Sequence, residues 1–295
     1  MTTKNNKIIY FGNEQLAQGV KTSTPIFDAL LDNDYHICAL ILPAARVRKP
    51  FPIAIKAQAA GIPIHYVSKA AELLPIVEQY QPEIGILSAF GKLVPESVIN
   101  AIPCGILNIH PSLLPKYRGT TPIETPLLNG DAETGVSVMR LVKAMDAGPI
   151  LAQSKVDITP ETTKQSLYES LSQLGAKLLI NVLPQALAKN AAETTQDESG
   201  ATFTTKLDKD MSELKFAEKG AQQLVREVVA FAGFPKSKTA LLGKLCTITS
   251  AHVASEPHTE LDQKCADGNY FIIDRLIPEN SKEMDAKSFL NGFKK

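Results

Sequence analysis

Apolar runs of strand length recur along the first half of the chain and alternate with segments of helical spacing. The runs lie at 7–12, 37–42, 63–66, 84–88 and 105–107, and the helical patterns lie at 25–31 and around 70–80. Strands separated by helices in this way predict a parallel, doubly wound, Rossmann-like sheet of the α/β class. Ligands of such a sheet bind beyond the carboxyl ends of its strands.

Two more strands are predicted at 135–139 and 150–158, and a long helix follows them. Thr159 is a suitable N-cap for this helix, with Pro160 at its first position. Pro184 is expected to kink the helix or to mark a break near its end. One side of the helix carries the apolar residues Leu167, Leu171, Leu174, Leu178, Val182 and Leu187.

The stretch 190–205 is poor in apolar residues, and we interpret it as an interdomain linker. It separates a domain at 1–189 from a domain at 206–295. In the second domain the pattern predicts a short amphipathic helix at 220–231 and strands at 245–253 and 270–276. Turn residues between these strands favour a small β-barrel.

Composition excludes several classes of protein. The formal net charge is +0, so charge gives no argument for a nucleic-acid partner and none against a local basic patch. The four cysteines are scattered and form no Cys-x-x-Cys pair, so no disulfide framework is expected. No metal site is expected either, because the spacing of His36, His65, His252 and His258 is not that of metal ligands. No signal-peptide core and no membrane-spanning stretch is found, which fits a cytoplasmic location.

Asn108 and His110 follow a buried strand and point to the same face of it. Pro111 disfavours a helical His110, so the strand should continue to the histidine. An amide beside an imidazole at a strand end can hold an oxygen that gains negative charge. On these two residues alone, a loop-capping histidine and a turn asparagine are the preferred interpretation.

The longer stretch changes that preference. Residues 108–119 read Asn-x-His-x-Ser-Leu-Leu-Pro-x-Tyr-Arg-Gly, and the match continues through 122–123, 130–136 and 145–151. This pattern resembles the folate-dependent formyltransferases and, in its order and spacing, those that act on methionyl-tRNA. The resemblance implies 10-formyltetrahydrofolate as formyl donor, initiator methionyl-tRNA as partner and an OB-like C-terminal domain. A monomer is expected, although no pattern in the sequence reports the oligomeric state.

The same resemblance assigns catalysis to Asn108, His110 and Asp146. In the implied reaction an amine attacks the formyl carbon and gives a tetrahedral intermediate with an oxyanion. Asn108 supplies a neutral donor to that oxygen, and His110 can donate to it and transfer a proton near neutral pH. Asp146 would orient His110 or a water and accept a proton. Without the resemblance, Asp146 reads equally well as a turn residue.

Folate is expected to bind the backbone of two loops, at 88–94 and 112–115. The apolar side chains of Leu113 and Leu114 are expected to pack against its flat ring. The residues predicted for this site are Ser88, Phe90, Gly91, Leu93, Ser112, Leu113, Leu114 and Pro115.

The tRNA site is predicted at a basic loop after the second strand. Arg46, Arg48 and Lys49 form the densest basic cluster of the catalytic half, and family members carry a basic loop at this point. A solvated surface loop is the usual explanation of such a run. Arginine, however, can pair bidentately with phosphate and stack on an unpaired base, which suits a tRNA acceptor end.

Departures from the family pattern keep other functions open. The family's Gly-Thr-Pro after the first strand is Gly12-Asn13-Glu14 here, and its Ile-Asp-Trp is Leu214-Lys215-Phe216. A phosphate loop typical of the enzyme that formylates phosphoribosylglycinamide is missing, which argues against that acceptor. The alternatives are a sugar-nucleotide N-formyltransferase, a formyltetrahydrofolate hydrolase, or a catalytically silent RNA-binding protein.

Overall fold

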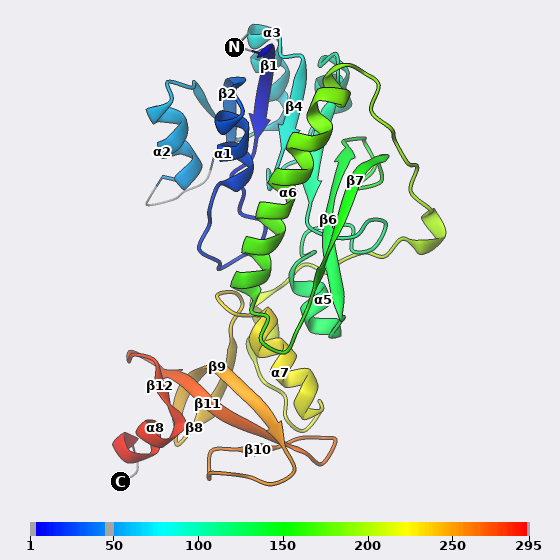
Figure 1. The fold of residues 1–295 in the computed structure, drawn as a ribbon. Helices are drawn as coiled ribbons and strands as arrows, with labels where there is room; N and C mark the ends of the chain where they lie inside the picture. Colours follow the sequence, from blue (N-terminus) through cyan, green and yellow to red (C-terminus); the bar gives the residue numbers. More distant parts are fainter. Residues whose placement is uncertain (1–3, 45–49, 294–295) are drawn as a thin grey trace.

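The fold was analysed in a computed structural model that describes residues 4–44 and 50–293. Its N-terminal part is built around a seven-stranded sheet in the order β3-β2-β1-β4-β5-β6-β7 (Figure 1). The strands are β1 Lys4–Phe11, β2 Tyr35–Pro43, β3 Ile64–Val67, β4 Ile84–Leu87, β5 Ile106–His110, β6 Glu133–Arg140 and β7 Ile150–Asp157.

The predicted parallel sheet is correct for β1 to β5 and wrong for the last two strands. β6 pairs antiparallel with β5, and β7 pairs antiparallel with β6. The connection 141–149 between β6 and β7 is too short for the crossover that parallel neighbours require. The connection 111–132 between β5 and β6 is long enough for a crossover, so its length does not set the antiparallel direction of β6. The fold is therefore a mixed α/β sheet that is mainly parallel.

Both faces of this sheet are covered because the alternating residues of each strand are buried on both sides. In β1, Ile8 and Tyr10 join one core cluster and Ile9 and Phe11 join another. The first cluster packs under α1 Pro25–Asp32, α2 Pro52–Ala59 and α6 Lys164–Leu187. The second packs under α3 Leu73–Tyr80, which follows the 3₁₀ turn η1 Ala70–Glu72, and under α4 Glu96–Asn100.

Helix α6 begins later than predicted, at Lys164. Its N-cap is Thr163, whose hydroxyl accepts from the Ser166 N–H at 3.0 Å while the Ser166 hydroxyl accepts from the Thr163 N–H at 3.0 Å. This reciprocal capping overrides the Thr159–Pro160 signal, since the Thr159 N–H instead donates to the Thr162 hydroxyl. Pro184 lies in the last turn, and the helix continues to Leu187.

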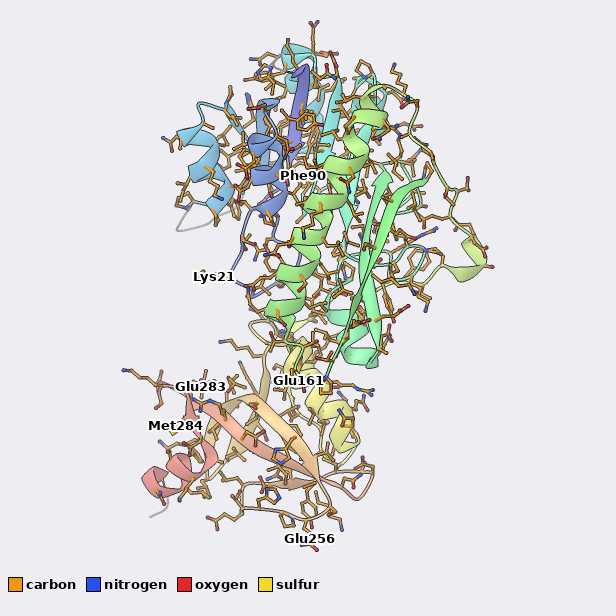
Figure 2. All side chains as sticks on the ribbon, in the orientation of Figure 1. Lys21, Phe90, Glu161, Glu256, Glu283 and Met284 are labelled. Carbon is orange, nitrogen blue, oxygen red and sulfur yellow. The ribbon has the colours of Figure 1, made fainter. Side chains whose placement is uncertain are left out.

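The C-terminal part has its own core and lies at the other end of the molecule (Figure 1). It contains α7 Ala221–Ala230 and α8 Ala286–Phe293. Its antiparallel sheet has the order β10-β11-β9-β8, with β12 on β11, and confirms the two predicted strands. The strands are β8 Ser237–Leu241, β9 Lys244–Ala254, β10 Gln263–Lys264, β11 Tyr270–Pro278 and β12 Met284–Asp285. Figure 2 places Phe90 among the side chains of the first part and Glu256 and Met284 on the second.

The segment 190–205 runs along the N-terminal sheet before it reaches α7 (Figure 1). Thr194 pairs with Ile150 through backbone hydrogen bonds of 2.8 and 2.9 Å. After η2 Glu198–Gly200, the Arg118 N–H donates to the Thr202 carbonyl and the Thr204 N–H donates to the Arg118 carbonyl. A second 3₁₀ turn, η3 Lys209–Ser212, precedes α7. The segment is thus attached to the N-terminal part, while the domain limits at 189 and 206 stay predictions.

Candidate active site

Strand β5 presents Asn108 and His110 on one face of the sheet, as the two-residue period requires. Ile109 between them points into the opposite core. A Cβ on Gly175 of α6 would lie 2.7 Å from Ile109 Cγ2, so only glycine lets α6 approach β5 this closely. Asn108 and His110 are 6% and 5% exposed, which places both polar groups at the end of a buried strand.

His110 is fixed through one of its two ring nitrogens. Nε2 lies 2.9 Å from the Tyr117 carbonyl oxygen. Since a carbonyl only accepts, Nε2 must carry the hydrogen, and in the neutral ring Nδ1 holds the lone pair. Nδ1 lies 3.7 Å from Asp146 Oδ2. The nitrogen that can exchange a proton therefore faces the carboxylate.

Asp146 lies in the loop between β6 and β7, whose chain passes over β5. The backbone N–H of Gly119 donates to Asp146 Oδ2 at 2.8 Å, and Asn108 Nδ2 lies 3.5 Å from Oδ1. Asp146 adopts φ +50°, the left-handed region that non-glycine residues seldom occupy. The structure thus brings together Asn108, His110 and Asp146, although Asp146 is 38 and 36 positions away from the other two in the sequence.

A cavity of about 400 Å³ opens in front of these three side chains. Its size falls within the range of small-molecule sites. Of the residues predicted to bind folate, Phe90 and Gly91 line it. Its other walls are formed by Gln15, Leu16, Ala17, Gln18, Leu87, Ala89, Ile109, Pro111, Gly119, Thr120, Pro122 and Lys206.

The other predicted folate residues lie outside the lining of this cavity. Leu93 is 82% exposed, and Ser88 is buried with its N–H bonded to the Phe11 carbonyl. In the loop 112–115, Ser137 Oγ donates to the Ser112 carbonyl at 2.6 Å and accepts from the Leu114 N–H at 3.2 Å. Leu114 is only 3% exposed. Through these contacts the loop 112–115 is attached to strand β6 beside the cavity. Contact between this loop and folate stays a prediction.

The loop after β1 closes one side of the cavity and is attached by Glu14. The Glu14 carboxylate accepts from the N–H groups of Ile26 and Phe27, at 3.0 and 2.8 Å, and from the Tyr10 hydroxyl at 2.9 Å. Burial raises the pKa of Glu14 to about 7, against the lowering effect of these donors. The glutamate that departs from the family pattern therefore has a structural task, which is to hold this loop on the start of α1.

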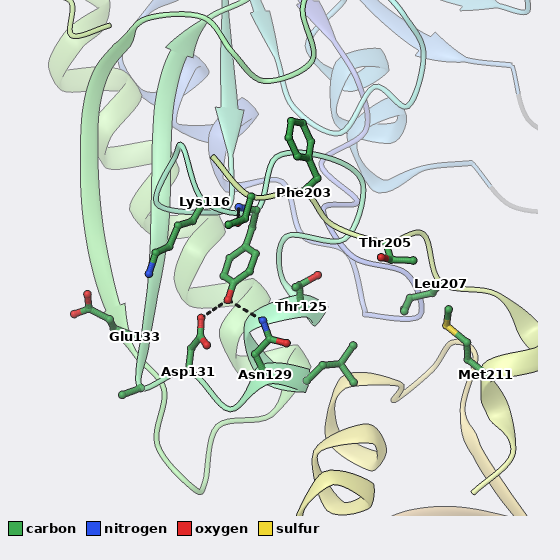
Figure 3. Close-up of a pocket in the computed structure, with 13 residues that line it drawn as sticks. Lys116, Thr125, Asn129, Asp131, Glu133, Phe203, Thr205, Leu207 and Met211 are labelled. Atoms are coloured by element: carbon green, nitrogen blue, oxygen red, sulfur yellow. Dashed lines mark hydrogen bonds between the residues drawn. The ribbon is translucent and has the colours of Figure 1, made fainter. Parts of the chain in front are cut away.

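A larger cavity, of about 680 Å³, contains none of the three predicted catalytic residues (Figure 3). Phe203, Leu207 and Met211 form part of its wall. Tyr117 also lines it, and its hydroxyl donates to Asp131 at 2.5 Å and accepts from Asn129 at 2.9 Å. Tyr117 thus lines this cavity while its carbonyl contacts His110, which lines the catalytic cavity.

Sequence reasoning missed two residues near Asp146. Lys206 lines the catalytic cavity, and the Gln196 amide nitrogen donates to the Asp146 carbonyl at 2.8 Å. Gln196 lies in the stretch 190–205, which was interpreted as a linker, and Lys206 follows it directly. The polar composition of that stretch gives no local indication that its residues pack against the site. Arg46, Arg48 and Lys49 lie outside the described residues.

Neither metal-binding clusters nor membrane-spanning helices are found in the described ranges 4–44 and 50–293. No group of three or more His, Cys, Asp or Glu side chains there could hold a metal ion. No helix in those ranges is long and apolar enough to cross a membrane.

Comparison with known proteins identifies a family over both parts of the chain. The family described as formyl transferase matches residues 48–183, and its C-terminal domain matches residues 206–294. The methionyl-tRNA formyltransferase of Latilactobacillus sakei is 31% identical over 97% of this chain and 94% of its own length. That of Methylococcus capsulatus is 33% identical over 97% and 96%.

Solved structures with the same fold are more distant in sequence. HypX from Aquifex aeolicus, in complex with tetrahydrofolic acid, has a TM-score of 0.67 at 15% identity and covers 97% of this chain and 47% of its own. An N-formyltransferase from Helicobacter canadensis, in complex with folinic acid and dTDP-3-aminofucose, has a TM-score of 0.68 at 17% identity, over 91% and 98%. At such identities the likeness shows the fold alone.

Proposed function

The chain belongs to the formyl transferase family, and on that premise we propose that it transfers the formyl group of 10-formyltetrahydrofolate to the α-amino group of initiator methionyl-tRNA. The observation that supports this most is the meeting of Asn108, His110 and Asp146 at one cavity of about 400 Å³. The product serves translation initiation, which implies a cytoplasmic location.

The three side chains divide the chemistry among them. As the amine nitrogen bonds to the formyl carbon, the formyl oxygen gains negative charge, and Asn108 Nδ2 is the neutral donor for it. His110 Nδ1 takes the amine proton, because Nε2 is committed to the Tyr117 carbonyl. The Asp146 carboxylate stabilises the resulting imidazolium. The proton then passes to the folate nitrogen as the carbon–nitrogen bond to folate breaks.

The folate ring is proposed to lie against Phe90 and Gly91, with Leu87 beside it. Ser88, Leu93 and the loop Ser112, Leu113, Leu114 and Pro115 belong to the same proposal as residues that support or flank the ring. No metal takes part in this mechanism, since the oxyanion and both proton transfers are served by side chains.

The C-terminal antiparallel sheet is proposed to be an OB-like tRNA-binding module. The family match to residues 206–294 supports this, as does the near full-length coverage by methionyl-tRNA formyltransferases. A monomer suffices for the proposal, because one chain supplies both the cavity and this second module.

Acceptor choice is tested by offering 10-formyltetrahydrofolate with methionyl-tRNA, with aminosugar nucleotides and with water alone. We expect formyl-methionyl-tRNA to be the main product, formed about 10²-fold or more faster than either alternative, a ratio typical of a site built around its acceptor. The measurement is the rate of formyl transfer from labelled donor. Formylation of an aminosugar nucleotide at the higher rate would replace the acceptor in this proposal and leave the chemistry in place.

The basic loop is proposed to hold the acceptor end of the tRNA. Replacing Arg46, Arg48 and Lys49 together by alanine should raise the KM for methionyl-tRNA about tenfold, and should lower its salt dependence by about 1 log unit per log unit of salt for each phosphate that is no longer neutralised. Tetrahydrofolate affinity should not change. Steady-state kinetics at two salt concentrations measure both effects. The matched comparison replaces Lys236, Lys238 and Lys244 by alanine. A larger rise of the KM in that variant would mean that the C-terminal part, and not the basic loop, contacts the tRNA.

A further inference from the structure

Gln196 reaches out of the segment 190–205 and holds the loop of Asp146. Its side chain is buried, with the residue 6% exposed. The amide nitrogen donates to the Asp146 carbonyl at 2.8 Å and to the Gly148 carbonyl at 2.7 Å. Both hydrogens of the amide group are thus used on one loop.

The other end of the same amide is bound to a buried arginine. Gln196 Oε1 accepts from Arg118 Nε at 3.1 Å and from Nη2 at 2.8 Å. Arg118 is 2% exposed, and its two terminal nitrogens also pair with Glu198 at 2.9 and 2.7 Å. A guanidinium only donates and a carbonyl only accepts, so reversing the amide would lose all four of its hydrogen bonds. The orientation of Gln196 is therefore fixed.

These contacts connect the two segments that position the Asp146 side chain. Gly119 follows Arg118 directly, and its N–H donates to Asp146 Oδ2 at 2.8 Å. Gln196 holds the Asp146 backbone on one side, and through Arg118 it holds the Gly119 donor on the other. Such fixation is needed because Asp146 sits at φ +50°, a conformation that a non-glycine residue keeps only when its surroundings hold it there.

We propose that Gln196, backed by Arg118, is a positioning residue for the Asp146 carboxylate beside His110. The inference rests on the proposed function of that site, and it adds a residue that neither family match covers, since those matches end at 183 and resume at 206. It also gives the segment before the C-terminal part an effect on the catalytic step, exerted through Asp146.

Gln196→Glu distinguishes the role of the amide nitrogen, which binds the Asp146 loop, from that of the amide oxygen, which binds Arg118. The variant keeps its length and its acceptor for Arg118, but it loses both donors to the loop and places a carboxylate against two carbonyls. We expect kcat to fall about tenfold to 10²-fold, as when groups that orient a catalytic residue are lost. Tetrahydrofolate binding, measured by fluorescence titration, should stay within about twofold, since Gln196 does not line the cavity.

The matched control is Glu193→Gln in the same segment. Glu193 accepts from Arg140 Nε at 2.6 Å, so it also ties this segment to the sheet but does not contact the Asp146 loop. Its kcat should equal that of the unaltered protein. An equal loss in both variants would mean that the segment acts only by being attached, and would overturn the proposal.

A double-mutant cycle with Asp146→Asn tests whether Gln196 acts through Asp146. In the Asp146→Asn background, Gln196→Glu should lower kcat by less than about twofold, because the group it positions is already inactive. The same fold loss in both backgrounds, or unchanged kcat in the single variant, would overturn the proposal. If Gln196→Glu does not fold, judged by its thermal melting, the cycle is run with Gln196→Met, which lacks the donors without adding charge.

The cycle is measured on whichever acceptor the unaltered protein formylates. Failure of methionyl-tRNA as acceptor would contradict the proposed function alone, whereas additive losses would contradict the role of Gln196 alone.

Discussion

Alanine at Asn108, His110 or Asp146 is expected to lower kcat by about 10²-fold or more, the scale for losing one preorganised donor or one acid–base group. Asn108→Ala removes the neutral donor for the oxyanion. His110→Ala removes the nitrogen that exchanges the proton, and Asp146→Ala removes the carboxylate 3.7 Å from it. Rates of formyl transfer at saturating substrates measure these losses.

Folding has to be measured together with activity, because two of these residues are buried. Asn108 and His110 belong to the buried strand β5. Thermal melting and tetrahydrofolate binding therefore accompany each rate. His65→Ala and Asp157→Ala are controls of the same residue types outside the cavity lining, and they should keep normal turnover. Near-normal turnover in Asp146→Ala would show that this loop is not catalytic.

Lys164→Met is expected to destabilise the protein by roughly 3–5 kcal/mol, because it leaves a buried charge without its partner. Lys164 and Glu124 are each 1% exposed, and Lys164 Nζ lies 3.8 Å from Glu124 Oε1. Lys164 Nζ also donates to the carbonyls of Gln18, at 2.8 Å, and Phe234, at 3.4 Å. Denaturant unfolding measures the loss. Lys155→Met, which removes an exposed ion pair to Glu133, should cost no more than about 1 kcal/mol.

The loss should grow with pH. Burial raises the pKa of Glu124 and lowers that of Lys164, and each partner opposes the shift of the other. Without Lys164, the pKa of Glu124 in the folded state rises further. Between its unfolded value and that raised value, the folded state binds a proton that the unfolded state lacks, so stability falls as pH rises through this window. Lys164→Met should thus be closer to the unaltered protein at pH 5 than at pH 8.

The double variant Lys164→Met/Glu124→Leu distinguishes the charge from the hydrogen bonds. An apolar pair of similar volume often replaces a buried ion pair at little cost, so most of the lost stability should return. A double variant as unstable as the single one would assign the loss to the hydrogen bonds with Gln18 and Phe234.

The sequence predicted the parallel strands well because their signal is local. Each of β1 to β4 is a short apolar run, and the spacing of Asn108 and His110 places them on one face without further knowledge. The directions of β6 and β7 differ from the prediction because periodicity does not report strand direction. Only for β7 does the short connection 141–149 exclude a parallel crossover.

The catalytic site could be predicted only in part, and for a similar reason. Asp146 was assigned through the family resemblance, since its turn-like surroundings carry no sign of where the loop goes. Gln196 was missed because its four hydrogen bonds join segments that are distant in sequence. Thr163 replaced Thr159 as the N-cap of α6 because two equally good capping residues stand four positions apart, and only the partner Ser166 decides between them.

The path of the segment 190–205 limits where the chain could be joined to the C-terminal part of a related protein. A recombination point at 189, where composition changes, would separate the catalytic part from Gln196 and from the pairing of Thr194 with Ile150. Leu207, further along, is still packed in the core of the N-terminal part. A chimaera that keeps the chain up to Leu207 would retain these contacts. It would still replace Ala230 and Phe231, which belong to the same core, and Phe234, whose carbonyl accepts from Lys164.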